Sequence, residues 1–567
     1  MNKALLIKHR DVFDCAPDPK NYRFMLLRCG GDIPLNICAT ISSLFSTGVG
    51  LDAQQSLESE LLTDSLKGKV ERFRQAEVGR NRSLIFTRAN ALLNLKCLLA
   101  AHRPERYSAT AVGAIALHAN DYLDIDLPTA DASLFMVQIL PVWEIYNPRD
   151  VGPLLRRYHY IFDEILSTDD RIIKLFAQEL ETTPGDLRVD GLKIDDYLAL
   201  MFGMYTGVSN SAKSLKTSIL DFSDPTSALD LLADEAHDFL RARSIDEDAM
   251  RAAINPLHDD QMFAAAVQTA GWATDFSMFR THPLLALSDG RLLVMDLQFL
   301  IENAASGLFW NTFYRIPTKR GRELLLGYWG EAFETYLRRL VVEHFTDAWT
   351  VLTNVTGPDF EIDILIIRDD VAVVIESKAG MLNNAVKVSR DFAKVTKAIV
   401  TKLVSNEKGK PKGVSQLARS CRAIARGEVS GISAIRRVYP LLVVDDPAFS
   451  APGTNTFLAE RFAELGTHEA AVAPPTIATI DEFEEIAPYI AAGDISWSEL
   501  LDRRFTPKGV DATPLHNTFT DVAKGRLRVR PNRLTLATGE RLHRLIEEKY
   551  KKLALRGNDS STGSRRR

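Results

Sequence analysis

Residues 359–380 read DFEIDILIIRDDVAVVIESKAG, two apolar runs that meet at Asp369 and Asp370. Each run has the length and the β-branched content of a buried strand, and the two acidic residues between them indicate a short turn. The stretch therefore predicts a β-hairpin with strands over residues 360–368 and 371–378. Charged side chains gather at the open end of this hairpin, where a core strand pair does not need them.

The length of the turn determines which residues face each other across the hairpin. A loop closed at Asp369-Asp370 places Asp363 opposite Glu376, and the same register places Glu361 opposite Lys378. Because strand side chains alternate, all four would project from one face. Opposed carboxylates repel each other and cost stability, whereas a divalent cation between them converts the repulsion into coordination. The alternative is an exposed strand end whose charges have no role.

The segments around the hairpin predict further elements in a defined order. A long helical pattern and an apolar run precede the hairpin, and a second helical pattern and another apolar run follow it. In chain order we expect a helix (323–345), a strand (349–355), the two hairpin strands, a helix (414–426) and a strand (438–446). This order is αβββαβ, which indicates a mixed sheet flanked by helices.

The ordered set of Asp363 followed by Glu376-Ser377-Lys378, on this αβββαβ pattern, resembles the PD-(D/E)XK nuclease superfamily and its restriction-endonuclease-like fold. The Mrr-like and RecB-like branches are the most similar, and the resemblance covers about residues 321–448. It implies that Asp363, Glu376 and the Ser377 carbonyl hold Mg²⁺ or Mn²⁺. It also implies that Lys378 positions the attacking water, and that the products carry 5′-phosphates. Asp359, which follows Pro358, is an alternative to Asp363.

The same resemblance implies a metal-binding and catalytic glutamate on the helix ahead of the first strand. Glu331 and Glu334 are the candidates in GEAFETYL. At helical spacing Glu334 borders the apolar stripe, while Glu331 points towards solvent, so we expect Glu334 to be the site residue. An ordinary helix-surface glutamate is the alternative interpretation.

Residues 381–412 form a basic segment between Lys378 and the second helix, with eight Lys and Arg against two acidic residues. Four of the basic residues follow helical spacing of 3 and 4, which predicts a basic helix face that would bind phosphates without reading sequence. On the second helix, Gln416 lies where Mrr-like and RecB-like members often carry a glutamine, and Arg419 follows one turn later. The predicted nucleic-acid contacts are thus Lys387, Arg390, Lys394, Lys397, Gln416 and Arg419; a solvated surface is the alternative.

The rest of the chain divides into three further regions by its patterns. Residues 1–275 contain helical periodicity, as in TAVGAIALHANDYL and KIDDYLALMFGMY, and predict an all-α domain. We identify no catalytic or cofactor-binding motif in this region. PLLALSDGRLLVMD predicts a β-hairpin within a connector at 276–320. The nuclease-like domain is expected over 321–500, followed by a basic segment at 501–567 with a disordered tail.

Charge and cysteine content limit the class of protein. The chain of 567 residues has a net charge of −5, but from Arg503 onward 17 Lys and Arg stand against 6 Asp and Glu, which suggests either an end that meets a polyanion or a solvated tail. The five cysteines lack a CxxC spacing, which favours reduced core thiols over disulfides or zinc ligands. No leader or membrane-spanning stretch is evident, so we expect a cytoplasmic protein.

Together these features predict a multidomain protein and a magnesium-dependent DNA endonuclease that serves bacterial defence or DNA processing. The helical region would recognise a substrate feature, a partner protein or a second copy of the chain. One alternative is a nucleic-acid-binding or scaffold protein that keeps the nuclease fold without cutting. Another is a nuclease directed at RNA.

Overall fold

The computed structural model describes residues 5–548 except 30, 49–52, 77–82, 102–108, 124–130, 190, 214–216, 221–239, 242, 256, 433–434, 467–468, 505–513, 525–529 and 546. It is a mixed α/β protein in which most of the described residues are helical. The predicted disordered tail, GNDSSTGSRRR, lies outside the described residues. Within the described part, no helix combines the length and the apolar content needed to cross a membrane.

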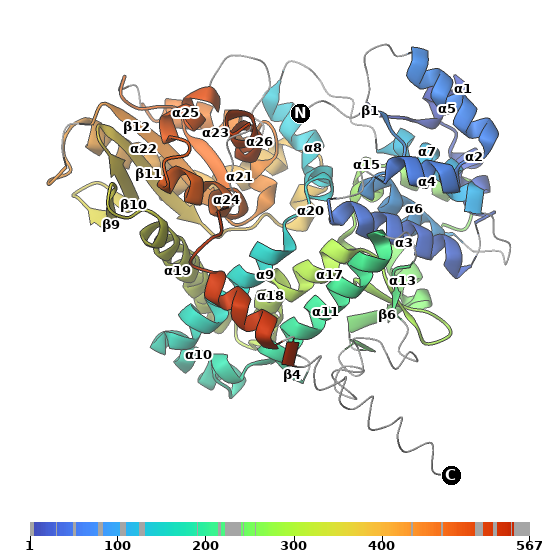
Figure 1. Ribbon diagram of the computed structural model, residues 1–567, viewed down its shortest axis with the longest axis horizontal. Coiled ribbons are helices and arrows are strands. Elements are labelled where there is room, and N and C mark those ends of the chain that lie inside the picture. Colours follow the sequence, from blue (N-terminus) through green and yellow to red (C-terminus); the bar gives the residue numbers. More distant parts are fainter. Residues whose placement is uncertain are drawn as a thin grey trace, which may run out of the picture.

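The sheet that contains the hairpin has five strands in the order β13-β12-β11-β10-β9 (Figure 1). Strands β9, β10 and β11 pair antiparallel, and β11, β12 and β13 pair parallel. The four strands that the sequence predicts here begin and end within two residues of their predicted positions. The bounds are β9 (Thr350–Thr356), β10 (Glu361–Arg368), β11 (Val371–Lys378), β12 (Arg437–Val444) and β13 (Thr476–Thr479).

Helices cover both faces of this sheet. Ile364, Ile366 and Ile375 belong to a core shared with α19 and α24, while Leu365 and Val374 belong to a second core shared with α21, α22 and α23. The alternation of apolar side chains along each strand therefore supplies both layers. The helices of this region are α19 (Lys319–His344), α20 (Asn384–Lys387), α21 (Phe392–Leu403), α22 (Gly413–Ala425), α23 (Thr454–Glu464), α24 (Ile480–Ala491), α25 (Trp497–Arg504) and α26 (Leu515–Val522).

The N-terminal region is mostly helical, but it is not all-α as expected. Short strands pair within it as β1 with β2, in parallel, and as β3 with β4. Its longer helices are α2 (Pro19–Leu26), α3 (Asp32–Ser46), α4 (Gln54–Leu61), α5 (Asp64–Ala76), α6 (Arg88–Ala100), α7 (Ala109–Tyr122), α8 (Ala132–Tyr146), α9 (Val151–Tyr160), α10 (Asp170–Leu180), α11 (Ile194–Lys213), α13 (Glu247–Ile254) and α14 (Asp260–Gln268). The shorter elements are β1 (Leu5–Leu6), α1 (His9–Phe13), β2 (Ser83–Leu84), β3 (Arg188–Val189), β4 (Leu192–Lys193), α15 (Ala270–Thr274) and α16 (Ser277–Thr281).

The predicted hairpin at residues 283–296 forms, as β7 (Leu284–Ala286) and β8 (Leu292–Val294). Gly290 takes a φ of 87° in its turn, a conformation that glycine adopts without steric cost. The hairpin is not a separate connector, because β5 (Ile219–Leu220) and β6 (Ser244–Asp246) add to its two edges in a four-stranded sheet. Helices α17 (Leu297–Ala304) and α18 (Ser306–Arg315) then lead to α19.

The hydrophobic cores do not divide at residue 275, where the sequence predicts a boundary. Trp143 and Leu140 of α8 belong to the same core as Leu365 of β10, and Tyr158 of α9 belongs to the same core as Phe333 of α19. Two helices of the N-terminal region therefore pack as part of the structure around the five-stranded sheet. Figure 1 shows α8 beside α23 and α20, and α9 near α19.

Candidate active site

The hairpin between β10 and β11 has the predicted register. Arg368 pairs with Val371 around a two-residue turn, and the pairing continues in step to Ile364 with Ile375. Asp369 takes a φ of 55° in the turn, a left-handed conformation that Asp tolerates better than most residues. The pairing ends just before Asp363 and Glu376, so these two carboxylates lie where the two strands separate.

Asp363 lies at an irregular point of β10. Ile362 and Ile364 belong to cores on opposite faces of the sheet. In a regular strand, residues i and i+2 would point to the same face. Across on β9, Asn354 has a φ of 53°. The Asp363 carboxylate turns to β11 instead, where its Oδ2 accepts hydrogen bonds from the Ser377 backbone N at 3.0 Å and from Ser377 Oγ at 3.3 Å. The strict alternation that was expected to align Glu361 with Asp363 is therefore interrupted here.

Glu376 and Lys378 end β11 as an ion pair. Lys378 Nζ donates to Glu376 Oε1 at 2.5 Å, which agrees with the expectation that the two side chains share a face. Glu376 is 1% exposed, whereas Lys378 is partly open to solvent. A buried carboxylate beside an accessible ammonium group is an arrangement that a strand end does not require for packing.

The structure separates the two candidate glutamates of α19 as the sequence predicts. Glu331 has a side chain that is 55% exposed and pairs with Arg171 on α10. Glu334 has a side chain that is 27% exposed, and its Oε1 accepts a hydrogen bond from Arg338 at 2.6 Å. Burial and the nearby Asp363 carboxylate raise the pKa of Glu334, so it lies within electrostatic reach of the hairpin end. The alternative aspartate, Asp359, is exposed in the loop before β10.

The four site residues form one electrostatic group. Burial raises the pKa of Glu376 to about 8, the negative charges of Asp363 and Glu334 act in the same direction, and Lys378 opposes them. A carboxyl group with this environment binds a proton readily, and a cation close to it would stabilise its charged form instead. The hairpin and α19 thus bring Glu334, Asp363, Glu376 and Lys378 together.

The carboxylate oxygens are not gathered as tightly as a site with three direct ligands requires. Among the residues that the structure describes, a single group of three or more His, Cys, Asp or Glu has its ligand atoms all within 4.8 Å, and it consists of His9, His118 and Asp121 in the N-terminal region. The set of Glu334, Asp363 and Glu376 does not meet that distance. The sequence patterns did not predict the histidine group, although His118 and Asp121 have the i, i+3 spacing of one helix face.

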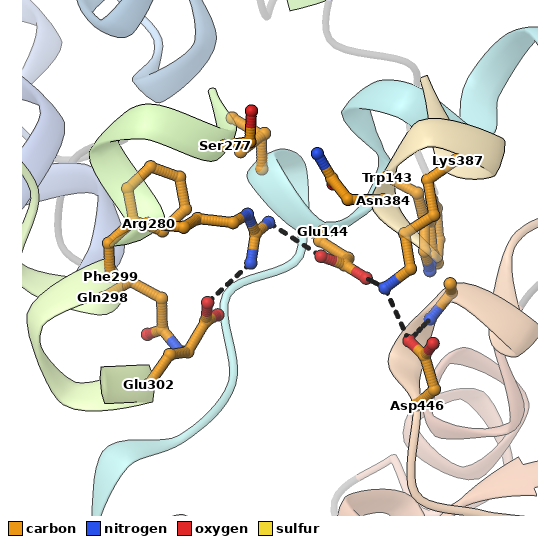
Figure 2. Close-up of polar contacts among 12 residues, drawn as sticks. Trp143, Glu144, Ser277, Arg280, Gln298, Phe299, Glu302, Asn384, Lys387 and Asp446 are labelled. Atoms are coloured by element: carbon orange, nitrogen blue, oxygen red, sulfur yellow. Dashed lines mark hydrogen bonds and ion pairs between the residues drawn. The ribbon is translucent and has the colours of Figure 1, made fainter. Parts of the chain in front are cut away.

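The predicted basic helix face is not formed, and Lys387 is the clearest correction. The chain breaks between α20 and α21, where Arg390 has a φ of 50°, so the four basic residues do not share one helix. Lys387 has a side chain that is 15% exposed; it contacts Glu144 of α8 and donates to Asp446 at 2.9 Å. Figure 2 shows Arg280 completing this network on the other side of Glu144. The buried Asp446 and the half-buried Glu144 both engage Lys387, so its charge is neutralised within the chain.

The other predicted nucleic-acid residues lie in different settings. Arg390 is half-buried, with its Nε and Nη2 atoms enclosed, and burial lowers its pKa. Lys394 and Lys397 of α21 and Arg419 of α22 are exposed, and Gln416 is half-buried. Three of the six predicted residues therefore present a charge to solvent.

A basic residue outside the predicted set, Lys412, lies within electrostatic reach of Lys378. Burial lowers the pKa of Lys412, and the charges of Lys402, Lys378 and Lys410 lower it further, so these three lysines lie within electrostatic reach of Lys412. Lys402 and Lys410 are exposed. The β-bridge between Ser405 and Pro411 folds the loop back, which brings Lys410 and Lys412 towards the end of α21 that carries Lys402. We call Lys402, Lys410 and Lys412 the lysine cluster.

Three of the six arginines that the structure describes from residue 503 onward form ion pairs within the chain. Arg530 pairs with Asp494, and Arg541 pairs with Asp163. The basic end predicted to meet a polyanion is thus partly neutralised by acidic residues of other elements.

Comparisons of the chain with protein-family models, with curated proteins and with solved structures found no match.

Proposed function

We propose that this protein is a metal-dependent nuclease of the PD-(D/E)XK type that hydrolyses phosphodiester bonds of DNA, with Mg²⁺ or Mn²⁺ as its cofactor. The observation that carries the proposal is the convergence of Asp363, Glu376 and Lys378 at the point where two paired strands separate. The order of elements from α19 to β12 is compatible with the family to which these residues have a resemblance.

The donor set fits a hard divalent cation. Asp363 and Glu376 are buried carboxylates, and each has one oxygen engaged by Ser377 or Lys378. Mg²⁺ is commonly held by one or two carboxylates and keeps several of its waters, so a site with two direct protein carboxylates is sufficient. Glu334, with its Oε1 bonded to Arg338, would contact the ion through water. The Ser377 carbonyl is the remaining candidate ligand.

The residues of the chain have distinct tasks in this proposal. A bound Mg²⁺ would supply Lewis-acid polarisation of the scissile phosphate. Lys378, held by Glu376, orients the attacking water and stabilises the negative charge that develops on the phosphoryl oxygens. Ser377 holds the Asp363 carboxylate in place through two hydrogen bonds, which reduces its freedom before substrate arrives.

The lysine cluster supports a polyanionic substrate. The charges of Lys402, Lys378 and Lys410 disfavour the charged form of Lys412 in the free protein, and phosphates of a nucleic-acid backbone would relieve that repulsion. Contacts of this kind are independent of sequence, so they favour a nuclease whose sequence preference comes from elsewhere in the chain or from no base contact at all.

The proposal is tested with supercoiled plasmid, linear duplex, single-stranded DNA and RNA, each in Mg²⁺, in Mn²⁺ or in EDTA. We expect DNA cleavage by the wild type with either metal and none in EDTA. Lys378→Ala should lower the rate by about 10²-fold or more, because one preorganised charge is lost. Lys174→Ala, at an exposed lysine of α10, is the matched control and should cut as the wild type does.

Cleavage that persists unchanged in Lys378→Ala would refute the assignment of the site. Binding of DNA without cleavage of any substrate would favour the alternative of a nucleic-acid-binding protein with a nuclease-like fold. Cleavage of RNA alone would move the proposal to an RNA-directed nuclease.

A further inference from the structure

Three side chains of the N-terminal region, remote in sequence from the hairpin, form a compact group of donors. His9 of α1 and His118 and Asp121 of α7 each bring a nitrogen or a carboxylate oxygen to within 4.8 Å of the others. His118 and Asp121 are buried, and His9 is half-buried. The group combines two imidazoles with one carboxylate.

The backbone that carries these residues is fixed on both sides. His118 and Asp121 lie one turn apart on the same face of α7. The backbone N–H of Ile7, two residues before His9, donates to the Leu84 carbonyl oxygen at 2.8 Å. The Ile7 carbonyl oxygen accepts a hydrogen bond from Asn120 Nδ2 at 2.8 Å. Asn120 belongs to α7 and is buried, so the helix that carries two of the donors also fastens the segment that carries the third.

The imidazole rings are held in a stack. The His118 ring lies nearly parallel to the His9 ring with a centroid distance of 3.8 Å, and Tyr22 stacks against His118 at 5.7 Å. Tyr22 is itself held by a hydrogen bond from its hydroxyl to Asn94 at 2.7 Å. Because the lone pair of an imidazole nitrogen lies in the plane of its ring, ligation of one ion by both residues requires the half-buried His9 ring to turn out of this stack.

Three side-chain atoms of this group are buried without a hydrogen bond. His118 Nδ1 and both carboxylate oxygens of Asp121 are buried without one, and the cation beside Asp121 is Arg10, whose Nε lies 3.6 Å from Oδ1. A buried polar atom without a hydrogen bond costs about 1–3 kcal/mol, and the guanidinium and backbone of Arg10 beside Asp121 offset part of this cost. A cation between the donors would satisfy them together.

We propose that His9, His118 and Asp121 bind a divalent transition-metal ion, with Zn²⁺ as the best chemical match, and that the ion fastens α1 to α7. Imidazole nitrogens with a carboxylate oxygen suit Zn²⁺, whereas Mg²⁺ prefers oxygen donors alone. Three protein ligands leave one tetrahedral position open. Cys15, which is exposed, lies at the edge of the group with its Sγ atom 3.6 Å from His9 Nδ1.

That separation has the right size for two ligands of one ion. With Zn–N of about 2.0 Å and Zn–S of about 2.3 Å, a tetrahedral angle gives an N···S distance of roughly 3.5 Å. A thiol at this position is available to the fourth coordination site after a small movement, and water takes the site otherwise. Zinc binding here is independent of the proposed nuclease activity, since its residues lie in another part of the chain.

The test uses the full-length protein, stripped with a chelator, re-equilibrated with ZnCl₂ and separated from free metal. We expect the wild type to retain about one equivalent of Zn²⁺ per chain and to show a higher thermal midpoint when Zn²⁺ is present. His9→Ala and Asp121→Asn should lose both the retained metal and the thermal shift. Asp121→Asn preserves the shape of the side chain, and His9 is half-buried, so both variants test ligation with little loss of packing.

Two matched variants keep the result specific. Asp363→Asn removes a carboxylate of the candidate active site, and His516→Ala removes a histidine that pairs with Glu485 on the surface of α24. Both should retain Zn²⁺ as the wild type does. A wild type that retains no Zn²⁺ would overturn the proposal, and so would His9→Ala and Asp121→Asn proteins that retain as much as the wild type.

Discussion

The Oδ2 atom of Asp363 accepts a hydrogen bond from the backbone N of Ser377 at 3.0 Å, so a carboxylate on β10 takes up a backbone donor of β11. The bond forms where the regular pairing of the two strands has ended. It therefore gives Asp363 a structural task in addition to the metal-binding task that we propose for it. Substitutions at this position can separate the two.

Asp363→Asn keeps an oxygen that can accept from Ser377 and removes the charge. We expect cleavage of plasmid DNA to fall by about 10²-fold or more, because the metal loses an anionic ligand. The free energy of unfolding should stay within about 1 kcal/mol of the wild type. Asp363→Ala removes both properties and should also lower the free energy of unfolding by about 1–3 kcal/mol, measured by urea denaturation. Full cleavage by Asp363→Asn would contradict the proposed role.

The lysine cluster should determine DNA affinity more than the exposed lysines of α21 or of distant helices. Replacing Lys402 and Lys410 together by Ala removes two exposed charges that act on Lys412. We expect weaker binding and a plot of log K against log salt that is shallower by about 0.9 for each phosphate that the variant no longer neutralises. Fluorescence anisotropy at several salt concentrations measures both quantities. Lys174→Ala is the control, and an equally weakened affinity in that variant would argue against a local phosphate site.

Glu144 should contribute stability that depends on pH. Burial alone would raise its pKa, but the charges of Lys387 and Arg280 outweigh this effect and lower the pKa to about 2 from the ordinary value of 4.5. A depressed carboxyl pKa stabilises the folded state above pH 4.5, and this contribution disappears as the pH falls from 4.5 to about 2.

Glu144→Gln should therefore lower the free energy of unfolding at pH 7 by about 3 kcal/mol, and the difference from the wild type should shrink as the pH falls through this range. Chemical denaturation at each pH measures it. The exposed Glu343 of α19 provides a matched Glu→Gln control, which we expect to be neutral. A deficit of Glu144→Gln that stays constant from pH 7 to pH 3 would contradict the role of the ion pairs.

The turn at Asp369 should reject a β-branched residue, because its φ of 55° lies in the left-handed region. Asp369→Val should lower the free energy of unfolding by about 1–2 kcal/mol, whereas Asp369→Gly should be within about 0.5 kcal/mol of the wild type. Thr350→Val, at an exposed position of β9, introduces the same residue in extended backbone and should not destabilise the protein. Equal effects of Val at both positions would show that the turn conformation is not responsible.

Local patterns predicted the elements around the hairpin well. The strands at 360–368 and 371–378 and the register through the turn agree with the structure, because apolar alternation and turn length act over a few residues. The placement of Glu334 at the border of the packed face and of Glu331 in solvent follows from helical geometry in the same way.

Helical spacing failed for Lys387 and Arg390, since the chain leaves the helix between α20 and α21. The partner of Lys387 is Glu144, 243 residues earlier, and no pattern in a window of the sequence contains both. Packing in the core is also non-local. Trp143 of α8 belongs to the same core as Leu365 of β10, and no local pattern contains both residues.

The amino-acid sequence by itself determined the secondary structure near the site and the residues that meet at the end of the hairpin, because these depend on local backbone geometry. The tertiary structure alone decided which charged side chains remain accessible to a bound ligand. It paired Lys387 with two carboxylates, placed Lys402, Lys410 and Lys378 within electrostatic reach of Lys412, and brought His9 to His118 and Asp121. Burial and ion pairing act through space, between residues that the sequence places far apart.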